Sequence, residues 1–384
     1  MRYIIEADIL LMGRELEIKR NVSIYVEDGI IGSIGLKGFS TSMDSRTIRI
    51  DLRGGIIMPP LVNSHIHMAD IGFEEVGWDL DIDSLVGEPY GLKYIMLRKF
   101  EKEVPGYIAR ALRLSRDSGV MMLNDFREMG LKGLRQGVKA GESFNDMIYI
   151  PSYMPDPESR DSLEKEIREA LSMTKWIGIS SPHYYDHELL KLIDSYAREH
   201  DAWIISHVAE TRDVREERDF ERLRDLRRLR AVVHGIYLSF DELLELRDRG
   251  VSLIICPRSN MWFGSGEVNK NMFEIEDLRI GLGTDNAGWI KPDLWREAEV
   301  LVDVMRLKHF GFDPREVLKY ATVYGGEIFG FRNYIEEGLE AALIGLKSEW
   351  LNPDRSGNIY LSIIKRGGIE SIRITLFRNS LRIL

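Results

Sequence analysis

Eight short apolar runs recur along the middle of this 384-residue sequence, and a charged stretch of amphipathic pattern follows each of them. After the second run, the starts lie roughly 20–30 residues apart, which is the length of one strand plus one helix. Runs that are apolar throughout, rather than alternating with polar residues, are typical of parallel strands buried on both faces. This rhythm predicts an α/β fold, a (β/α)8 TIM-type barrel. The runs are Ile56–Val62, Val120–Leu123, Met147–Ile150, Trp176–Ile179, Trp203–Ile205, Ala231–Val233, Val251–Ile255 and Ile280–Leu282.

The two ends of the chain have a different pattern, with short alternating strands separated by turns such as Asp28-Gly29 and Gly367-Gly368. They predict a small β-sandwich domain built from both chain termini. The last fifty residues are expected to contain strands at Ile359–Ile364 and Ser371–Phe377. The expected domains are 1–55 and 333–384 for the two parts of the β domain, and 56–332 for the barrel.

Three helix starts can be predicted inside the barrel from residues that favour such positions. Asp186 is expected to cap a helix over 188–199, Ser239 one over 241–249, and Asp313 with Pro314 one over 315–320. The densely charged stretch 211–230 is expected to be a solvated helical face. The interval 68–118 is about twice as long as the others. Because an insertion after a barrel strand lies on the catalytic face, we expect a lid or specificity segment there, with a helix over 94–102.

Composition restricts the partners and the compartment. The net charge of −10 argues against a nucleic-acid partner. No stretch of apolar residues is long enough for a membrane span, and the acidic N-terminus does not resemble a secretion signal. The single cysteine, Cys256, permits no internal disulfide. A cytoplasmic protein is therefore expected. Charged residues make up 30% of the sequence, a composition typical of proteins from thermophiles.

Residues suited to metal binding gather after the predicted strands. His65 and His67 follow the first run with a spacing that places both side chains on one face of a strand. His207 and Asp285 follow the fifth and eighth runs, and the carboxyl ends of barrel strands meet at one face. Three imidazoles and one carboxylate, with room for a water, fit a catalytic zinc site, or an iron site.

Three further residues follow strands at the same face. Glu210 lies three residues past His207, where its carboxylate suits proton transfer to a leaving group. His183 and His234 follow the fourth and sixth runs. By contrast, His187, His200 and His309 fall in expected helices or loops and are assigned no chemical role.

Six motifs together resemble the amidohydrolase superfamily, in the branch that holds the cytosine, guanine and adenosine-type deaminases and the triazine chlorohydrolases. The resemblance extends over nearly the whole chain. The motifs are His65-x-His67, Pro182-His183, His207-Val-Ala-Glu210-Thr, Val-His234-Gly, Cys256-Pro-Arg-Ser-Asn260 and Gly-Thr284-Asp285-Asn.

The resemblance implies a metal-dependent aminohydrolase that deaminates a nitrogen heterocycle (a purine, a pyrimidine or a triazine-like ring) by attack of a metal-bound hydroxide, with release of ammonia. One divalent metal, Zn²⁺ or Fe²⁺, would be held by four ligands. Dinuclear members use a carboxylated lysine at a strand end, but the one lysine near the fourth run, Lys175, precedes it. The ligands implied are His65, His67, His207 and Asp285.

The resemblance also implies the catalytic roles. Glu210 would carry a proton to the ring nitrogen, His234 would orient the water or the substrate, and Asp285 would take the proton from the water. His183 would contact the substrate.

Two other residues are weaker candidates for substrate binding. Arg127 is a candidate partner for an anionic substrate group, although an ordinary salt bridge is the commoner role of such an arginine. Trp262 would form an aromatic wall of the pocket or simply pack.

Other functions stay open at this point. Ring opening of a cyclic amide, as in imidazolone-type hydrolases, and dechlorination would use the same site. A scaffold protein that has lost catalysis is a further alternative. The substrate and the native metal remain open. A homodimer is expected only by analogy with other barrel enzymes.

Overall fold

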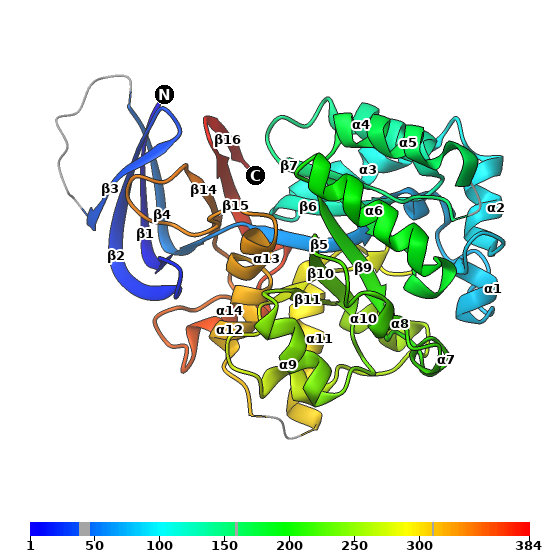
Figure 1. Ribbon diagram of the computed structural model, residues 1–384. Helices are drawn as coiled ribbons and strands as arrows, with labels where there is room; N and C mark the ends of the chain where they lie inside the picture. Colours follow the sequence, from blue (N-terminus) through cyan, green and yellow to red (C-terminus); the bar gives the residue numbers. More distant parts are fainter. Residues whose placement is uncertain (38–46, 158–159, 309–310) are drawn as a thin grey trace. The chain divides into compact units, whose positions relative to one another are not determined.

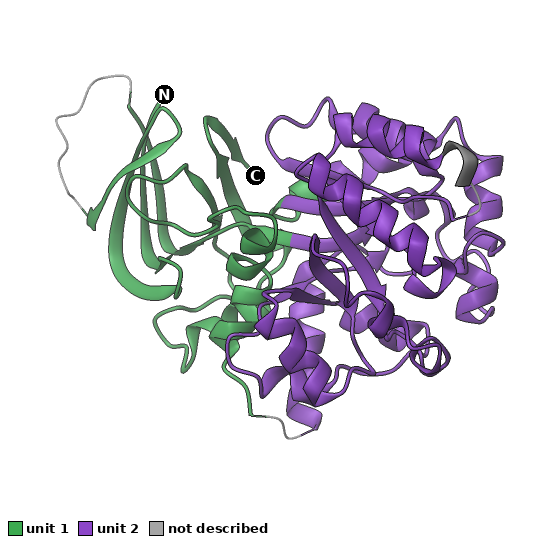
Figure 2. Ribbon diagram, viewed as in Figure 1, with its two compact units in different colours: residues 1–62, 115–121, 311–384 green, residues 63–114, 122–310 purple. Residues whose placement is uncertain are grey.

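The computed structural model describes residues 1–37, 47–157, 160–308 and 311–384 (Figure 1). His309 lies outside the described residues. The chain divides into two compact units, one of residues 1–62, 115–121 and 311–384 and the other of residues 63–114 and 122–310 (Figure 2). In the part of the chain that is described, none of the helices combines the length and the apolar character needed to cross a membrane.

The first unit is built on one mixed sheet of seven strands, in the order β16-β15-β14-β4-β1-β2-β3. The central strand β1 pairs parallel with β4 and antiparallel with β2. Apolar side chains such as Ile5, Ile24 and Leu343 form its buried core. The small β domain built from both termini is thus confirmed. The strands are β1 (Arg2–Met12), β2 (Glu17–Glu27), β3 (Ile30–Leu36), β4 (Thr47–Met58), β14 (Ala342–Leu346), β15 (Ile372–Phe377) and β16 (Ser380–Ile383).

The first apolar run of the sequence belongs to two strands rather than one. Ile56–Met58 ends β4 of the small sheet, and the first barrel strand is β5 (Leu61–His67). Pro59 and Pro60 separate them, because proline has no N–H group to donate to a sheet.

The expected strand Ile359–Ile364 is wrong, because this segment is a helix, α14 (Ile359–Arg366). Its buried residues Ile359, Ile363 and Ile364 follow the helical spacing. Asn358 caps the helix by accepting a hydrogen bond from the N–H of Leu361.

The second unit holds the parallel barrel sheet, in the order β12-β11-β10-β9-β8-β7-β6-β5-β13. The strands β12 (Ile280–Leu282) and β13 (Asp285–Asn286) form the eighth position of the barrel together. Between them, Gly283 donates its N–H to Ile255 (2.9 Å) and Thr284 donates to His65 (3.0 Å), so the ring closes on both sides. The TIM-type barrel is confirmed. The other strands are β6 (Val120–Arg127), β7 (Ile148–Tyr153), β8 (Trp176–Ile179), β9 (Trp203–Val208), β10 (Leu229–His234) and β11 (Ser252–Ile255).

The three predicted helix starts are confirmed. Asp186 and Asp313 each accept a backbone N–H as N-caps, and Ser239 forms a capping box with Glu242. The helices of the described residues, besides α14, are α1 (Ile82–Val86), α2 (Leu92–Lys99), α3 (Val104–Asp117), α4 (Gly130–Gly141), α5 (Arg160–Met173), α6 (His187–Glu199), α7 (Arg212–Glu216), α8 (Asp219–Arg222), α9 (Phe240–Asp248), α10 (Pro257–Trp262), α11 (Leu294–Leu307), α12 (Pro314–Tyr320) and α13 (Val323–Ile328).

The long interval after β5 contains a 3₁₀ turn, η1 (Met68–Phe73), followed by α1, α2 and α3. The helix expected over 94–102 is α2, shifted toward the N-terminus. The other 3₁₀ turns are η2 (Pro182–Tyr184), η3 (Lys270–Phe273) and η4 (Ile369–Ser371).

The charged stretch 211–230 is not one solvated helical face. It forms two short helices, α7 and α8, because Asp219 is buried and accepts the backbone N–H of Ala209 at 2.6 Å. That contact draws the chain inward between the two helices.

Helices α10 and α11 are joined by a buried carboxyl group. Glu297 of α11 accepts the backbone N–H of Arg258 at 3.1 Å and lies 3.3 Å from the Arg258 guanidinium. Burial raises the pKa of Glu297 to about 8, although Arg258 opposes the shift. Part of the Glu297 population is therefore neutral at pH 7.

We expect Gly283→Ala to destabilise the barrel, because the added Cβ would lie 2.9–3.0 Å from the backbone oxygen, the backbone nitrogen and the Cβ of His65. Such crowding typically costs about 1–3 kcal/mol. Thermal unfolding measured by circular dichroism should show a lower midpoint. Gly106→Ala in α3 is the matched control, because a Cβ there meets nothing within 4 Å. An unchanged midpoint for Gly283→Ala would show that the closure tolerates a side chain.

We expect Glu297→Gln to gain stability relative to the wild type as the pH rises from 5 to 8. The pKa of Glu297 is raised in the folded protein, so its contribution to stability is complete below the unfolded value near 4.5 and is lost as the pH rises through about 8. Glutamine has no such loss. Denaturant unfolding of both proteins across this range should show their difference changing by up to about 1.4 kcal/mol per pH unit. A constant difference would contradict a raised pKa.

Candidate active site

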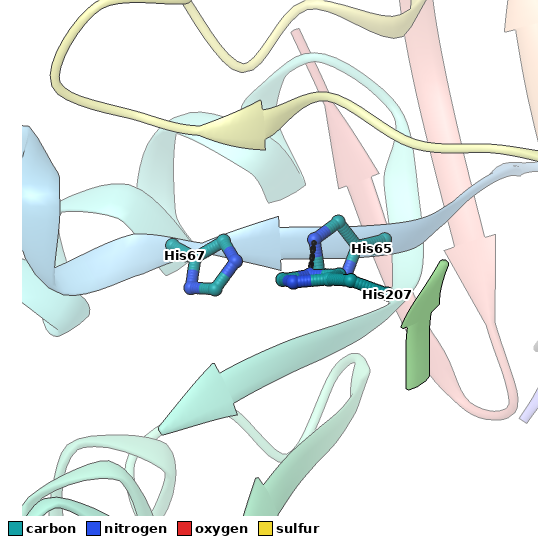
Figure 3. Close-up of side chains that lie close together, drawn as sticks. All are labelled: His65, His67 and His207. Carbon is teal, nitrogen blue, oxygen red and sulfur yellow. Dashed lines mark hydrogen bonds between the residues drawn. The ribbon is translucent and has the colours of Figure 1, made fainter. Parts of the chain in front are cut away.

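Four ligand atoms converge at the carboxyl ends of the barrel strands. His65 and His67 extend from one face of β5, as their spacing predicted, and His207 of β9 lies beside His65 (Figure 3). The Nε2 atoms of His207 and His65 are 3.1 Å apart. Oδ1 of Asp285 lies 3.2 Å from Nε2 of His65 and 3.4 Å from Nε2 of His67. Metal–ligand bonds of about 2.0–2.1 Å in a tetrahedral shell place ligand atoms about 3.3–3.4 Å apart. The four atoms therefore have the separations of such a shell.

The hydrogen bonds around the cluster direct nitrogen lone pairs toward its centre. Nδ1 of His207 lies 2.7 Å from the backbone oxygen of Ser180, and Nδ1 of His67 contacts Oε1 of Glu128. Both acceptors require the proton on Nδ1, so each Nε2 carries a lone pair. Nε2 of His65 can direct a proton toward only one of its neighbours. Several acceptor atoms thus face one another without a proton between them, and this donor set fits a divalent cation.

Burial also keeps the imidazoles in the neutral form that binds metals. It lowers the pKa of His65 to about 3 and holds the pKa of His207 well below its ordinary value. Burial would raise the pKa of Asp285, but the hydrogen bond with His65 and the nearby His234 hold it well below its usual range. Asp285 is consequently a carboxylate. The donor set at neutral pH is three imidazoles and one anion.

A second group of side chains lies beside the ligand atoms. Nε2 of His234 is 3.4 Å from Oε2 of Glu210, and Nδ1 of His234 lies 2.8 Å from Oδ1 of Asn260, which accepts its proton. The hydroxyl of Ser259 donates to Oδ2 of Asp285 at 2.5 Å. Burial raises the pKa of Glu210, which favours a carboxyl that can deliver a proton. Helix α10 supplies both Ser259 and Asn260, so it orients the carboxylate and the imidazole together.

Two of these residues have an uncommon backbone conformation. His234 has φ of 72° and Asp285 has φ of 61°, in the left-handed region that residues other than glycine rarely adopt. Such a conformation costs about 1–3 kcal/mol and persists only where the surroundings hold it. Both residues stand at the ends of barrel strands, where this conformation directs their side chains toward the ligand cluster.

A pocket with about 710 Å³ of empty space, part of it open to solvent, lies over this cluster. The long interval after β5 supplies part of its wall, including Asp83, Glu88 and Tyr94. His183 lines the opposite part, half-buried, with Nδ1 accepting the hydroxyl proton of Ser181 at 2.7 Å. The size suits a small heterocyclic ligand. The polar residues of the cluster that face the pocket are His67, His207, Glu210, His234 and Asp285.

Arg127 does not reach this pocket, which corrects the sequence interpretation. Strand β6 continues to Arg127, and successive side chains of a strand point to opposite faces. Phe126 contacts the His65 ring at a centroid distance of 4.6 Å, so Arg127 points away from it. The Arg127 guanidinium instead pairs with Asp125 at 3.1 Å and with Glu128 at 3.4 Å.

Trp262 also lies outside the pocket. It ends helix α10, its side chain is 46% exposed, and it is not among the residues that line the cavity. The neighbouring Ser259 and Asn260 contact the cluster instead. The helix therefore contributes to the site through its first turn rather than its last.

Sequence reasoning missed the buried charges beneath His67. Glu128 contacts Nδ1 of His67, and Lys93 lies 2.6 Å from the same carboxylate oxygen. Lys93 also lies 3.1 Å from Asp70. Glu128 could have been found from the period of a strand, because it shares the face of Phe126 two residues earlier. Lys93 has no such signal, because a helix from a distant segment brings it here.

Comparisons with known proteins agree with this geometry. An uncharacterized protein of Methanocaldococcus jannaschii is 27% identical, covering 88% of each chain. The 5-methylthioadenosine/S-adenosylhomocysteine deaminase of Pyrococcus furiosus is 26% identical over 95% of this chain and 91% of its own. An adenosine deaminase structure from Xanthomonas campestris with bound zinc has the same fold, with a TM-score of 0.82 at 17% identity over 100% of this chain and 93% of that one.

The sequence pattern of the Amidohydrolase family matches residues 56–367, which span the barrel and every residue of the cluster. The motifs quoted from the sequence alone lie within this range, and the resemblance they suggested is confirmed. This chain belongs to the amidohydrolase family.

Proposed function

We propose that this protein is a metal-dependent aminohydrolase that removes the amino group of an adenosine-type nucleoside and releases ammonia. The observation that carries the proposal is the convergence of His65, His67, His207 and Asp285 at ligand distances, with Glu210 and His234 on the same pocket. The similarity to a deaminase of methylthioadenosine and S-adenosylhomocysteine supports the choice of substrate class.

Zinc, or Fe²⁺, held by these four residues would lower the pKa of a water molecule and so supply a nucleophile near neutral pH. The remaining chemistry belongs to side chains of the protein. Asp285, held in orientation by the Ser259 hydroxyl, is placed to accept the proton of the water. His234, fixed through Asn260, orients the reacting groups from the other side.

Glu210 is suited to deliver a proton to the ring. Burial raises its pKa, so it can hold a proton near neutral pH, and its carboxyl lies beside His234 at the pocket wall. Protonation of the ring nitrogen next to the attacked carbon makes that carbon more electrophilic. The same proton, once moved on, makes ammonia the leaving group.

The pocket also favours a substrate without an anionic group. Among the described residues that line it, Lys93 is the single lysine or arginine, and its ammonium is held by Asp70 and Glu128. Asp83 and Glu88 stand on the wall, and Oε2 of Glu88 has no hydrogen-bond partner in the described structure. A phosphate would meet carboxylates and no unpaired cation. We therefore propose a nucleoside rather than a nucleotide as substrate.

Ammonia release by zinc-loaded protein tests the activity. We expect turnover of adenosine, 5′-deoxyadenosine or methylthioadenosine, and little turnover of guanine, cytosine or melamine. Glu210→Gln should lower kcat at least about 10²-fold, because it removes the proton donor while keeping the shape. Glu216→Gln, an exposed residue of α7, should leave kcat unchanged. Full activity of Glu210→Gln would contradict the proton transfer, and silence across the panel with zinc bound would contradict the substrate class.

Paired kinetics with adenosine and AMP test the charge of the pocket. We expect kcat/KM for AMP to be at least about 10²-fold lower, because a desolvated phosphate would face Glu88 without a compensating cation. The cationic analogue 5′-amino-5′-deoxyadenosine should be accepted at least as well as adenosine. Equal kcat/KM values for adenosine and AMP would contradict the proposed selectivity.

A further inference from the structure

The buried charges beneath the ligand cluster have no part in the chemistry described so far. Lys93 is 3% exposed, and Asp70 and Glu128 are fully buried. An isolated buried charge is strongly unfavourable, so such groups persist only when they are paired and hydrogen-bonded. What these residues contact should therefore indicate what they do.

Lys93 uses its three donors on protein acceptors. Its Nζ lies 2.6 Å from Oε1 of Glu128, 3.1 Å from Oδ2 of Asp70 and 3.0 Å from Oδ1 of Asn286. These acceptors come from β6's end, from η1 and from β13. An ammonium with three partners has no donor left for a substrate, although Lys93 borders the pocket. Its role is therefore positional.

The oxygen that Lys93 holds is the one that faces the ligand cluster. Oε1 of Glu128 contacts Nδ1 of His67, whereas the second oxygen, Oε2, has Arg127 at 3.4 Å and no hydrogen bond. Lys93 and His67 thus donate to one and the same atom. A carboxylate that accepts from Nδ1 places the imidazole proton there and leaves Nε2 as the lone-pair donor.

We propose that Lys93 is a positioning residue that, by holding Glu128 against Nδ1 of His67, fixes His67 in the orientation and tautomer that bind the metal. The inference rests on the metal site of the proposed function. It adds that the strength of metal binding depends on a helix of the long interval after β5, because Lys93 lies on α2 beside the pocket residue Tyr94.

Zinc affinity measured by competition with a chromophoric chelator tests this inference without any substrate. Lys93→Met should weaken zinc binding about 10–100-fold, the usual effect of removing a group that orients a metal-bound histidine. Lys99→Met is the matched control, because Lys99 is an exposed lysine on the same helix. Its dissociation constant should stay within about twofold of the wild type.

A double-mutant cycle separates positioning from general loss of structure. If Lys93 acts through Glu128, then Lys93→Met combined with Glu128→Gln should bind zinc no more weakly than Glu128→Gln alone. Multiplying effects would overturn the proposal. The visible spectrum of the cobalt-loaded protein should change in Lys93→Met and not in Lys99→Met.

The remaining outcomes also decide the matter. If Lys93→Met does not fold without metal, as judged by circular dichroism, Lys93→Gln takes its place, since it keeps hydrogen-bond donors and loses only the charge. Wild-type affinity in a folded Lys93 variant would overturn the inference while the proposed function stands. Failure of the wild type itself to bind zinc would instead overturn the metal site on which both depend.

Discussion

The structure depends on a crowding of electron pairs that the protein cannot relieve by itself. Nitrogen and oxygen acceptors of His65, His67, His207 and Asp285 meet at 3.1–3.4 Å, and burial holds the pKa values of His65 and His207 too low for protonation to compensate. Such an arrangement is unfavourable without a cation and favourable with one. The rigid barrel, closed through Gly283, keeps these atoms from moving apart.

The same requirement explains the polar groups around the cluster. Each ligand is oriented by a further partner: Ser180 for His207, Ser259 for Asp285 and Glu128 for His67. Helix α10 and strand β6 place these partners, so the geometry of the site is distributed over segments far apart in the sequence. The left-handed backbone of Asp285 is one local cost of this geometry.

Much of the fold and of the ligand cluster could be predicted because they follow local periods. A strand places His65 and His67 on one face, and strand ends in a barrel share one rim, which brings in His207 and Asp285. The same period could have corrected Arg127 had the full length of β6 been known, since a strand four residues longer decides which side chains face inward.

Other features depend on tertiary contacts that no local pattern encodes. The segment 359–366 has apolar residues that suit either a strand or a helix, and packing selects the helix. The place of Lys93 follows from how the interval between β5 and β6 folds back over the barrel, as does the break at Asp219. Buried ion pairs of this kind join residues whose separation in sequence carries no information.

The position of Lys93 has a consequence for how this enzyme can diversify. The segment that shapes the substrate pocket also carries a charge that balances the floor of the barrel, so the two cannot be exchanged separately. Grafting the corresponding segment from a relative with another specificity would remove the ammonium and leave Asp70 and Glu128 facing each other. Retargeting this scaffold therefore requires that a graft keep a cation at this place, or that both acids be replaced with it.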